Sequence, residues 1–171
     1  AAGPARTTAN LWGERWAKLA TNCMGNAICG ITGLNAASFW RSAEARDVAI
    51  RIVDELLDVA EALGIQIEKV GGIGTSLFRS AQHDTDERAT LEAAMIALAE
   101  DVGSGRPSLA QDVIKHRKTE IDELNGYVVR KGRELGIATP VNEAIVDVTR
   151  QVERGQIEPS LALLGQLAEV E

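Results

Sequence analysis

The chain has 171 residues and a formal net charge of −7, and 45% of its residues are hydrophobic although only 4% are aromatic. This length and composition predict one globular domain with a core of Ala, Leu, Ile and Val, and they exclude a disordered chain. No basic run is present, so we expect no nucleic-acid partner. No apolar run is long enough to predict a membrane helix, so we expect no membrane partner either.

Apolar residues at helical spacing predict an all-α fold, a helical bundle over residues 10–171, after a linker or ragged start over residues 1–9. The first helix is expected from Asn10 to about Gly33. Its buried face should carry apolar residues spaced three and four apart, namely Trp12, Trp16, Leu19, Cys23 and Ala27. The clearest apolar stripe predicts one helix from Ser38 to Leu63, which ends before Gly64.

The second half of the chain predicts shorter helices, bounded by capping residues, glycines or prolines. We expect them over residues 86–101, 108–116 and 119–135, from residue 140 onward, and from Pro159 to the end. Thr119 should cap the third of these, with Asp122 as a variant partner in a capping box. The stretch 65–76 predicts a loop or a short extended piece, and it lacks the third glycine and the preceding strand of a dinucleotide-binding loop.

The two cysteines, Cys23 and Cys29, lie on one predicted helix and have no companions at metal-ligand spacing. We therefore expect two small buried apolar residues, with neither a metal site nor a structural disulfide. No signal-peptide pattern opens the chain, and together with the unpaired cysteines this predicts a reducing, cytoplasmic location.

Three polar side chains, Lys18, Asn22 and Asn26, follow one narrow stripe of the first helix at a spacing of four residues. Asparagine is a poor helix former, so two of them are an odd choice for a solvated surface. One interpretation is an exposed polar edge, and the other is a lysine with two amides directed into a cleft. Such a lysine could protonate a carbonyl oxygen as it becomes an alkoxide, and the amides could hold other oxygens.

Two further residues stand at predicted helix starts. Ser108 lies where free N–H groups favour an anion such as a carboxylate, although the same position suits a plain helix cap. Glu120 follows Thr119 in a predicted first turn, where the helix dipole favours any carboxylate. Asp112 and Asp122 are expected at helix ends or in salt bridges, so none of these residues by itself indicates a site.

Taken together, the polar residues resemble a known family in order and spacing. The pattern W-x-K-L-x-x-N-x-x-x-N covers Trp16–Asn26, the pattern S-x-x-Q-D-x-x-x-x-R-x-T-E-I-D-x-L-N-G covers Ser108–Gly126, and GIATPVN covers Gly136–Asn142. These segments resemble the C-terminal domain of the ketopantoate reductase family over about residues 10–154. The resemblance implies a bundle of the 6-phosphogluconate dehydrogenase C-terminal-domain type.

Members of that family reduce 2-ketopantoate to pantoate with NADPH, on the route to pantothenate. The resemblance implies that Lys18 is the general acid and that Glu120 contacts the substrate hydroxyl and helps to orient Lys18. It implies that Asn22 and Asn26 hold the hydroxyl and keto side of a small 2-keto acid, and that Ser108 binds its carboxylate.

The resemblance also implies that NADPH is bound mainly by an N-terminal Rossmann domain, which this sequence does not contain. We therefore expect the chain to be a fragment that is inactive alone and has the Rossmann domain as its partner. Broad apolar stripes, and relatives that are often dimeric, predict a homodimer. The alternative that stays open is a non-catalytic helical dimerisation or regulatory module with the same fold.

Overall fold

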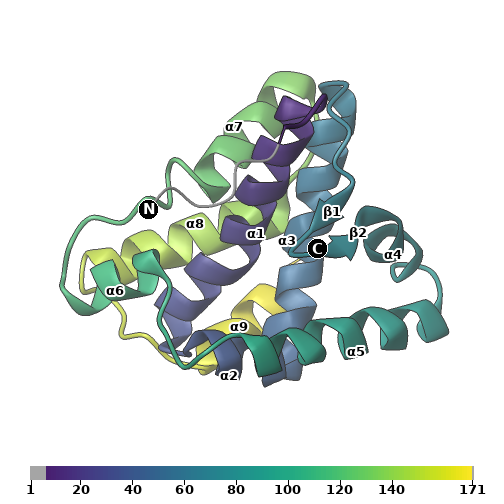
Figure 1. Ribbon diagram of the computed structural model, residues 1–171. Helices are drawn as coiled ribbons and strands as arrows, with labels where there is room; N and C mark the ends of the chain where they lie inside the picture. The colour runs from purple at the N-terminus through teal and green to yellow at the C-terminus, as the bar shows by residue number, and fades with distance from the viewer. Residues whose placement is uncertain (1–6, 171) are drawn as a thin grey trace.

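The computed structural model describes residues 7–170, apart from the side chain of Asp101. Over this range the chain forms nine helices and one antiparallel two-stranded hairpin (Figure 1). The elements are α1 (Leu11–Thr32), α2 (Ala36–Arg41), α3 (Ala43–Ala62), β1 (Lys69–Val70), β2 (Ile73–Gly74), α4 (Thr75–Ser80), α5 (Thr85–Asp101), α6 (Ser108–Ile114), α7 (Asn125–Leu135), α8 (Pro140–Glu153) and α9 (Ala162–Ala168). The predicted all-α class is confirmed, and none of these helices is long and apolar enough to cross a bilayer.

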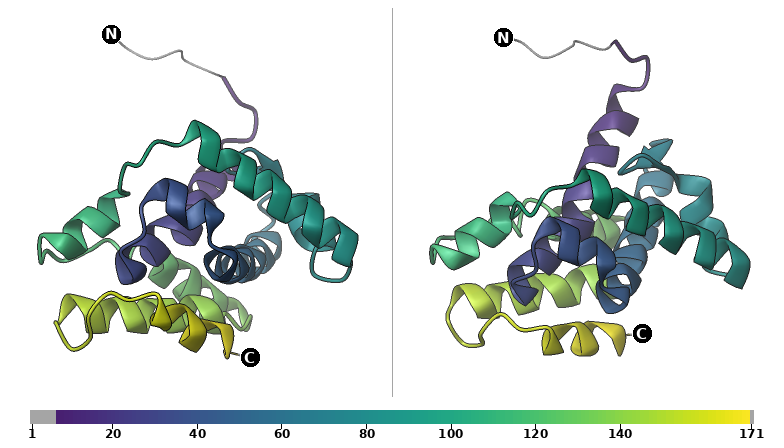
Figure 2. Two further views of the ribbon diagram at one scale, coloured as in Figure 1. Left: turned by 90° about the horizontal axis from the view of Figure 1, so that it is seen from below. Right: turned by 60° about the horizontal axis from the view of Figure 1, so that its bottom comes forward.

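The helix α1 runs through the centre of the bundle and packs against α3, α6 and α8 (Figures 1 and 2). Asn10 caps its start by accepting a hydrogen bond from the Gly13 amide at 3.0 Å, and Gly33 ends it in the left-handed conformation, with φ 75°. Such a φ is open to glycine at little cost, so the predicted end at this residue is confirmed.

The buried face of α1 is largely the predicted one, but its first turn differs. Trp16 and Cys23 are buried, and burial raises the pKa of both cysteine thiols, that of Cys29 to about 12. Both cysteines are therefore unpaired apolar core residues, as predicted. Trp12 is 60% exposed, so its predicted burial is wrong. Its indole lies beneath the Arg15 guanidinium, 5.3 Å away, because this first turn carries its ring away from the core.

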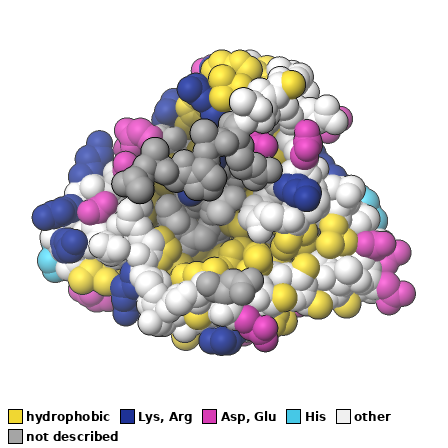
Figure 3. All heavy atoms as spheres, viewed as in Figure 1, with side chains coloured by type: hydrophobic (Ala, Val, Ile, Leu, Met, Phe, Trp, Pro, Cys, Tyr) yellow, Lys and Arg dark blue, Asp and Glu magenta, His cyan; other side chains and the backbone are white. Residues whose placement is uncertain are grey.

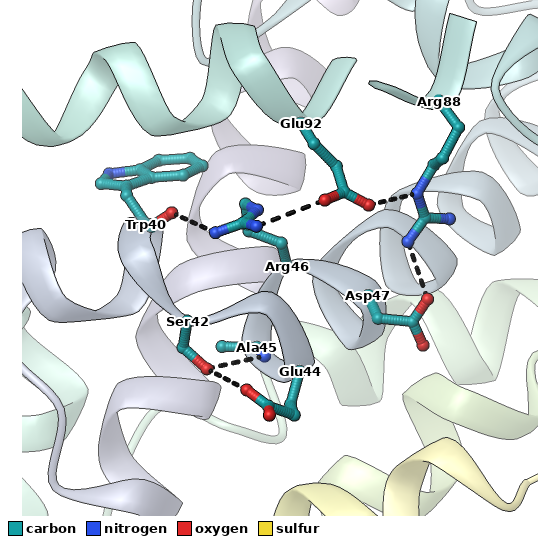
Figure 4. Close-up of polar contacts among 8 residues, drawn as sticks. All are labelled: Trp40, Ser42, Glu44, Ala45, Arg46, Asp47, Arg88 and Glu92. Carbon is teal, nitrogen blue, oxygen red and sulfur yellow. Dashed lines mark hydrogen bonds and ion pairs between the residues drawn. The ribbon is translucent and has the colours of Figure 1, made fainter. Parts of the chain in front are cut away.

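The predicted single helix from Ser38 to Leu63 is wrong, because the chain breaks into α2 and α3 at Ser42 (Figure 4). Ser42 is extended, with ψ 124°, and its side chain accepts a hydrogen bond from the Ala45 amide at 3.2 Å. The Trp40 carbonyl, released from helical bonding, accepts a hydrogen bond from Arg46 at 2.9 Å. Arg46 also binds Glu92 of α5 at 3.2 Å, so the break attaches α5 to the bundle.

The start of α8 at Pro140 is confirmed, but its cap comes from a distant helix. Thr139 makes no capping hydrogen bond with its side chain. Instead, Glu55 of α3 accepts hydrogen bonds from the amides of Val141 at 2.7 Å and Asn142 at 2.9 Å. A carboxylate at this position satisfies two free amides and complements the helix dipole. A contact between α3 and α8 thus supplies the cap that Thr139, the residue before the helix, does not provide.

The last helix is shorter than predicted, because residues 159–161 are not helical and α9 begins only at Ala162. The Ser160 amide donates to the Ile31 carbonyl at the end of α1, at 2.8 Å. The same serine accepts a hydrogen bond from the Ala162 amide at 3.2 Å. This attachment fixes the chain before the final helix and packs α9 beside α3.

Candidate active site

The polar stripe of α1 lies on the side of the helix that the core leaves open. Lys18 is exposed, Asn22 and Asn26 are half-buried, and the adjacent Cys23 and Ala27 are fully buried. Lys18 forms no ion pair with any side chain that the structure describes. An ammonium group that is open to solvent and free of a carboxylate partner remains available to a ligand.

A hollow of about 570 Å³ lies between the first half of α1 and the β1–β2 hairpin, and Lys18 lines it. The other lining residues are Asn10, Gly13, Glu14, Ala17, Thr21, Glu68, Lys69, Gly71 and Gly72. The hairpin docks here through the Gly71 amide, which donates to the Thr21 hydroxyl at 3.2 Å. Figure 3 shows acidic and basic side chains interspersed over the face of the molecule that Figure 1 also views.

The two lysines and two glutamates that line this hollow balance in formal charge. Asn22 and Asn26 are not among its lining residues, so the stripe extends beyond the hollow along α1.

Ser108 is brought to the far end of the stripe by α6, which packs on α1 at Gly30. A Cβ on Gly30 would lie 2.5 Å from the Leu109 side chain, so this close approach requires glycine. Gly30 follows Asn26 by one helical turn and lies on the same side of α1. Pro107 occupies the N-cap position of the helix, and Ser108 is its first residue. The alternative of a plain side-chain cap therefore lacks support.

Glu120 lies in a turn and not in a first helical turn as predicted, because α7 begins only at Asn125. The predicted capping by Thr119 of a helix that continues to Leu135 is therefore wrong. The Thr119 hydroxyl accepts a hydrogen bond from the Ile121 amide at 3.2 Å, within the turn. Its own amide donates to Glu153 of α8 at 2.7 Å. This contact from α8 competes with the helical path that the local sequence favours.

The turn that carries Glu120 is also fixed at Asp122. Arg150 of α8 donates to the Asp122 carboxylate at 2.7 Å, and Arg130 of α7 donates to the Asp122 carbonyl at 2.9 Å. The expectation of a salt bridge for Asp122 is confirmed. Glu120 itself is exposed. Its carboxylate is therefore open to solvent, while contacts with α7 and α8 hold the backbone of its turn.

The turn reaches α1 through Asn125, the first residue of α7. Its side-chain amide donates to the Cys23 carbonyl of α1 at 3.3 Å and to the Asn142 side chain at 3.0 Å. Cys23 directly follows Asn22, so the start of α7, five residues after Glu120, is bonded to the middle of α1. The structure thus places α6, which begins at Ser108, and α7, which follows the Glu120 turn, in contact with α1, but neither Ser108 nor Glu120 lines the hollow beside Lys18. The spacing of polar residues in the sequence does not by itself point to Asn125 and Asn142. Their signal is that asparagine, a poor helix former, stands near the start of two helices.

The geometry defines a helical domain with one open polar helix face, and comparisons with known proteins agree with it. The family model described as "Ketopantoate reductase PanE/ApbA C terminal" matches residues 10–153. The chain therefore belongs to the ketopantoate reductase family, in the part that forms its C-terminal domain.

Named relatives fit this assignment. The chain is 30% identical over 151 residues to the 2-dehydropantoate 2-reductase of Pyrobaculum aerophilum, which covers 88% of this chain and 47% of the relative. It is 32% identical over 139 residues to the enzyme of that name from Vibrio cholerae, which covers 81% of this chain and 40% of the relative. The chain thus spans less than half the length of these curated relatives.

Solved structures show the same arrangement of helices. A PanE/ApbA family ketopantoate reductase from Ralstonia eutropha is similar with a TM-score of 0.69 and 31% identity, over 90% of this chain and 45% of that one. A D-mandelate dehydrogenase, solved with NADH and anilino(oxo)acetate, is similar with a TM-score of 0.68 and 27% identity, over 86% of this chain and 54% of that one.

Proposed function

We propose that this chain is the substrate-binding and catalytic half of a nicotinamide-dependent reductase for a small 2-keto acid, with 2-ketopantoate as the leading substrate. The observation that carries the proposal is the position of Lys18, which lines the hollow and shares one helix face with Asn22 and Asn26. Membership of the family supports it. The similar D-mandelate dehydrogenase, with NADH and an oxoacetate compound, supports a broader 2-keto acid class.

Each polar residue has a part that its chemistry suits. Reduction of a ketone builds negative charge on its oxygen, and the Lys18 ammonium would stabilise that charge and donate the proton. Asn22 and Asn26 would hold the hydroxyl and keto side of the substrate. Ser108 would donate to the substrate carboxylate, and Glu120 would accept from the substrate hydroxyl and help to orient the Lys18 amine.

The residues of this chain fit only the reacting end of a nicotinamide cofactor, which supplies the hydride when bound. A dinucleotide pyrophosphate requires clustered positive charge or a glycine-rich turn at a helix start. The two lysines and two glutamates that line the hollow form no positive cluster, and Gly71 and Gly72, which also line it, are the turn of the β1–β2 hairpin and do not start a helix. We infer that NADPH is held mainly by a Rossmann domain outside residues 10–171, and that the working enzyme is a cytoplasmic homodimer.

The test is NADPH oxidation by the complete gene product with 2-ketopantoate and with other 2-keto acids. Lys18→Ala should lower kcat by about 100- to 10,000-fold, the range that a positioned general acid supplies. Lys115→Ala, which removes an exposed lysine at the end of α6, is the matched control and should leave kcat unchanged.

Unchanged turnover in Lys18→Ala would exclude it as the general acid. If the complete protein reduces no 2-keto acid, the non-catalytic module becomes the better hypothesis. Ser108→Ala should raise KM more than it lowers kcat, and a loss of thermal stability alone would return Ser108 to a structural part.

A further inference from the structure

A continuous network of polar side chains crosses the core and links four helices. Glu55 of α3 accepts from the Asn142 side chain at 2.7 Å, and Asn142 of α8 accepts from Asn125 at 3.0 Å. Asn125 of α7 donates in turn to the Cys23 carbonyl of α1 at 3.3 Å. Both asparagines are completely buried. This polar network therefore connects α3, α8, α7 and α1 by directional hydrogen bonds in the core.

Burial of such a network is costly. A buried amide costs free energy unless all of its polar atoms are bonded, and apolar side chains of similar volume often pack as well. Asn142 is well satisfied, because it also donates to the Ile52 carbonyl at 3.2 Å. The side-chain oxygen of Asn125, however, is buried without a hydrogen-bond partner among the described residues. A residue that keeps an unsatisfied oxygen in the core is explained poorly by stability alone.

The Asn125 end of this polar network lies near the proposed site, where the positions of the side chains must be accurate. Asn125 follows Glu120 by five residues, and its acceptor Cys23 adjoins Asn22 and lies one to two turns after Lys18. The turn with Glu120 is bonded to α8 through Glu153 at 2.7 Å. Among the described side chains, the bond from Asn125 is the only hydrogen bond that joins α7 or α8 to α1. It therefore sets the register between the turn and the polar stripe.

We propose that Asn125 and Asn142 are positioning residues, which hold the Glu120 turn at a fixed place relative to α1, the helix that carries Lys18 and Asn22. This inference rests on the proposed reductase function. Apolar packing tolerates small slides of one helix along another, whereas two amides bonded in series do not. A displacement of about 1 Å can lower a rate by about 100-fold without removing any group that touches the substrate.

The test compares Asn125→Ala with Thr149→Val in the complete gene product. Thr149 is equally buried, but its hydroxyl donates only to the Ile145 carbonyl of its own helix, at 2.7 Å. Both variants lose buried hydrogen bonds and should unfold at lower temperature. Asn125→Ala should lower kcat by about 10- to 100-fold with a change in KM of less than threefold. Thr149→Val should keep both constants within about twofold of wild type, since it leaves the register between α7 and α1 intact.

Equal kcat values in Asn125→Ala and Thr149→Val, per folded enzyme, would overturn the positioning role while the reductase function stands. A wild-type protein that reduces no 2-keto acid would overturn the function and this inference with it. If Asn125→Ala does not fold, Asn125→Ser retains a hydroxyl donor, one bond short of the Asn125 amide nitrogen, and should lose about three- to tenfold in kcat. Wild-type kcat in the serine variant would also overturn the proposal.

Discussion

Removal of the Glu55 carboxylate is expected to destabilise the protein more than removal of any exposed acidic residue. The carboxylate accepts from the Val141 amide, the Asn142 amide and the Asn142 side chain, at distances between 2.7 and 2.9 Å. Burial raises the pKa of the Glu55 carboxyl, and the hydrogen bonds from Asn142 and Val141 act in the opposite direction. In Glu55→Ala the three donors lose their acceptor, and water replaces it only in part.

The magnitude follows from these contacts. Loss of a helix cap costs about 1 kcal/mol, and each hydrogen bond to a charged group contributes about 1.5–3 kcal/mol when its partner stays buried. Because Glu55 is only half-buried and water can replace part of it, we expect a loss of about 3 kcal/mol in the free energy of unfolding. For a chain of this size, that loss corresponds to a fall of about 6–12 °C in Tm.

Thermal and urea unfolding, followed by far-ultraviolet circular dichroism, measure the effect. Glu143→Gln is the matched control, because Glu143 lies in the first turn of the same helix and pairs with the exposed Arg133 at 3.1 Å. The control should lose less than about 0.5 kcal/mol. A loss below about 1 kcal/mol in Glu55→Ala would show that α8 does not depend on a cap from α3.

Two further predictions concern other parts of the bundle. The hydrogen bond from Arg88 holds the pKa of the Glu92 carboxyl below its ordinary value. The stability that ionised Glu92 contributes is therefore fully present above about pH 4.3, and it is lost as the pH falls through the lowered pKa. The difference in Tm between wild type and Glu92→Gln should therefore be largest near neutral pH and shrink in acid; an equal difference at every pH would contradict this. Gly132→Ala should cost about 1–3 kcal/mol, because the new Cβ would lie 2.8 Å from the Ile137 carbonyl oxygen. In Gly25→Ala the new Cβ would lie 3.8 Å from the Phe39 ring, an ordinary contact, so this variant should stabilise α1 by about 0.5–1 kcal/mol. Equal unfolding curves for the two variants would refute the comparison.

The sequence by itself determined the features that depend on near neighbours in the chain. The cap at Asn10 and the left-handed end at Gly33 are contacts or conformations within a few residues, so the bounds of α1 could be predicted. The stripe of Lys18, Asn22 and Asn26 follows from helical spacing alone, and the motifs around it carry the family resemblance. For the same reason the all-α class could be predicted from apolar periodicity.

Only the tertiary structure decided the features that depend on partners far along the chain. The local pattern continues through Ser42, but Arg46 bridges from there to Glu92 and the helix breaks. The turn that carries Glu120 is set by contacts with α8, and its place along α1 is set by Asn125. Such contacts join residues as many as 102 positions apart, so their bonds exist only after the helices have packed.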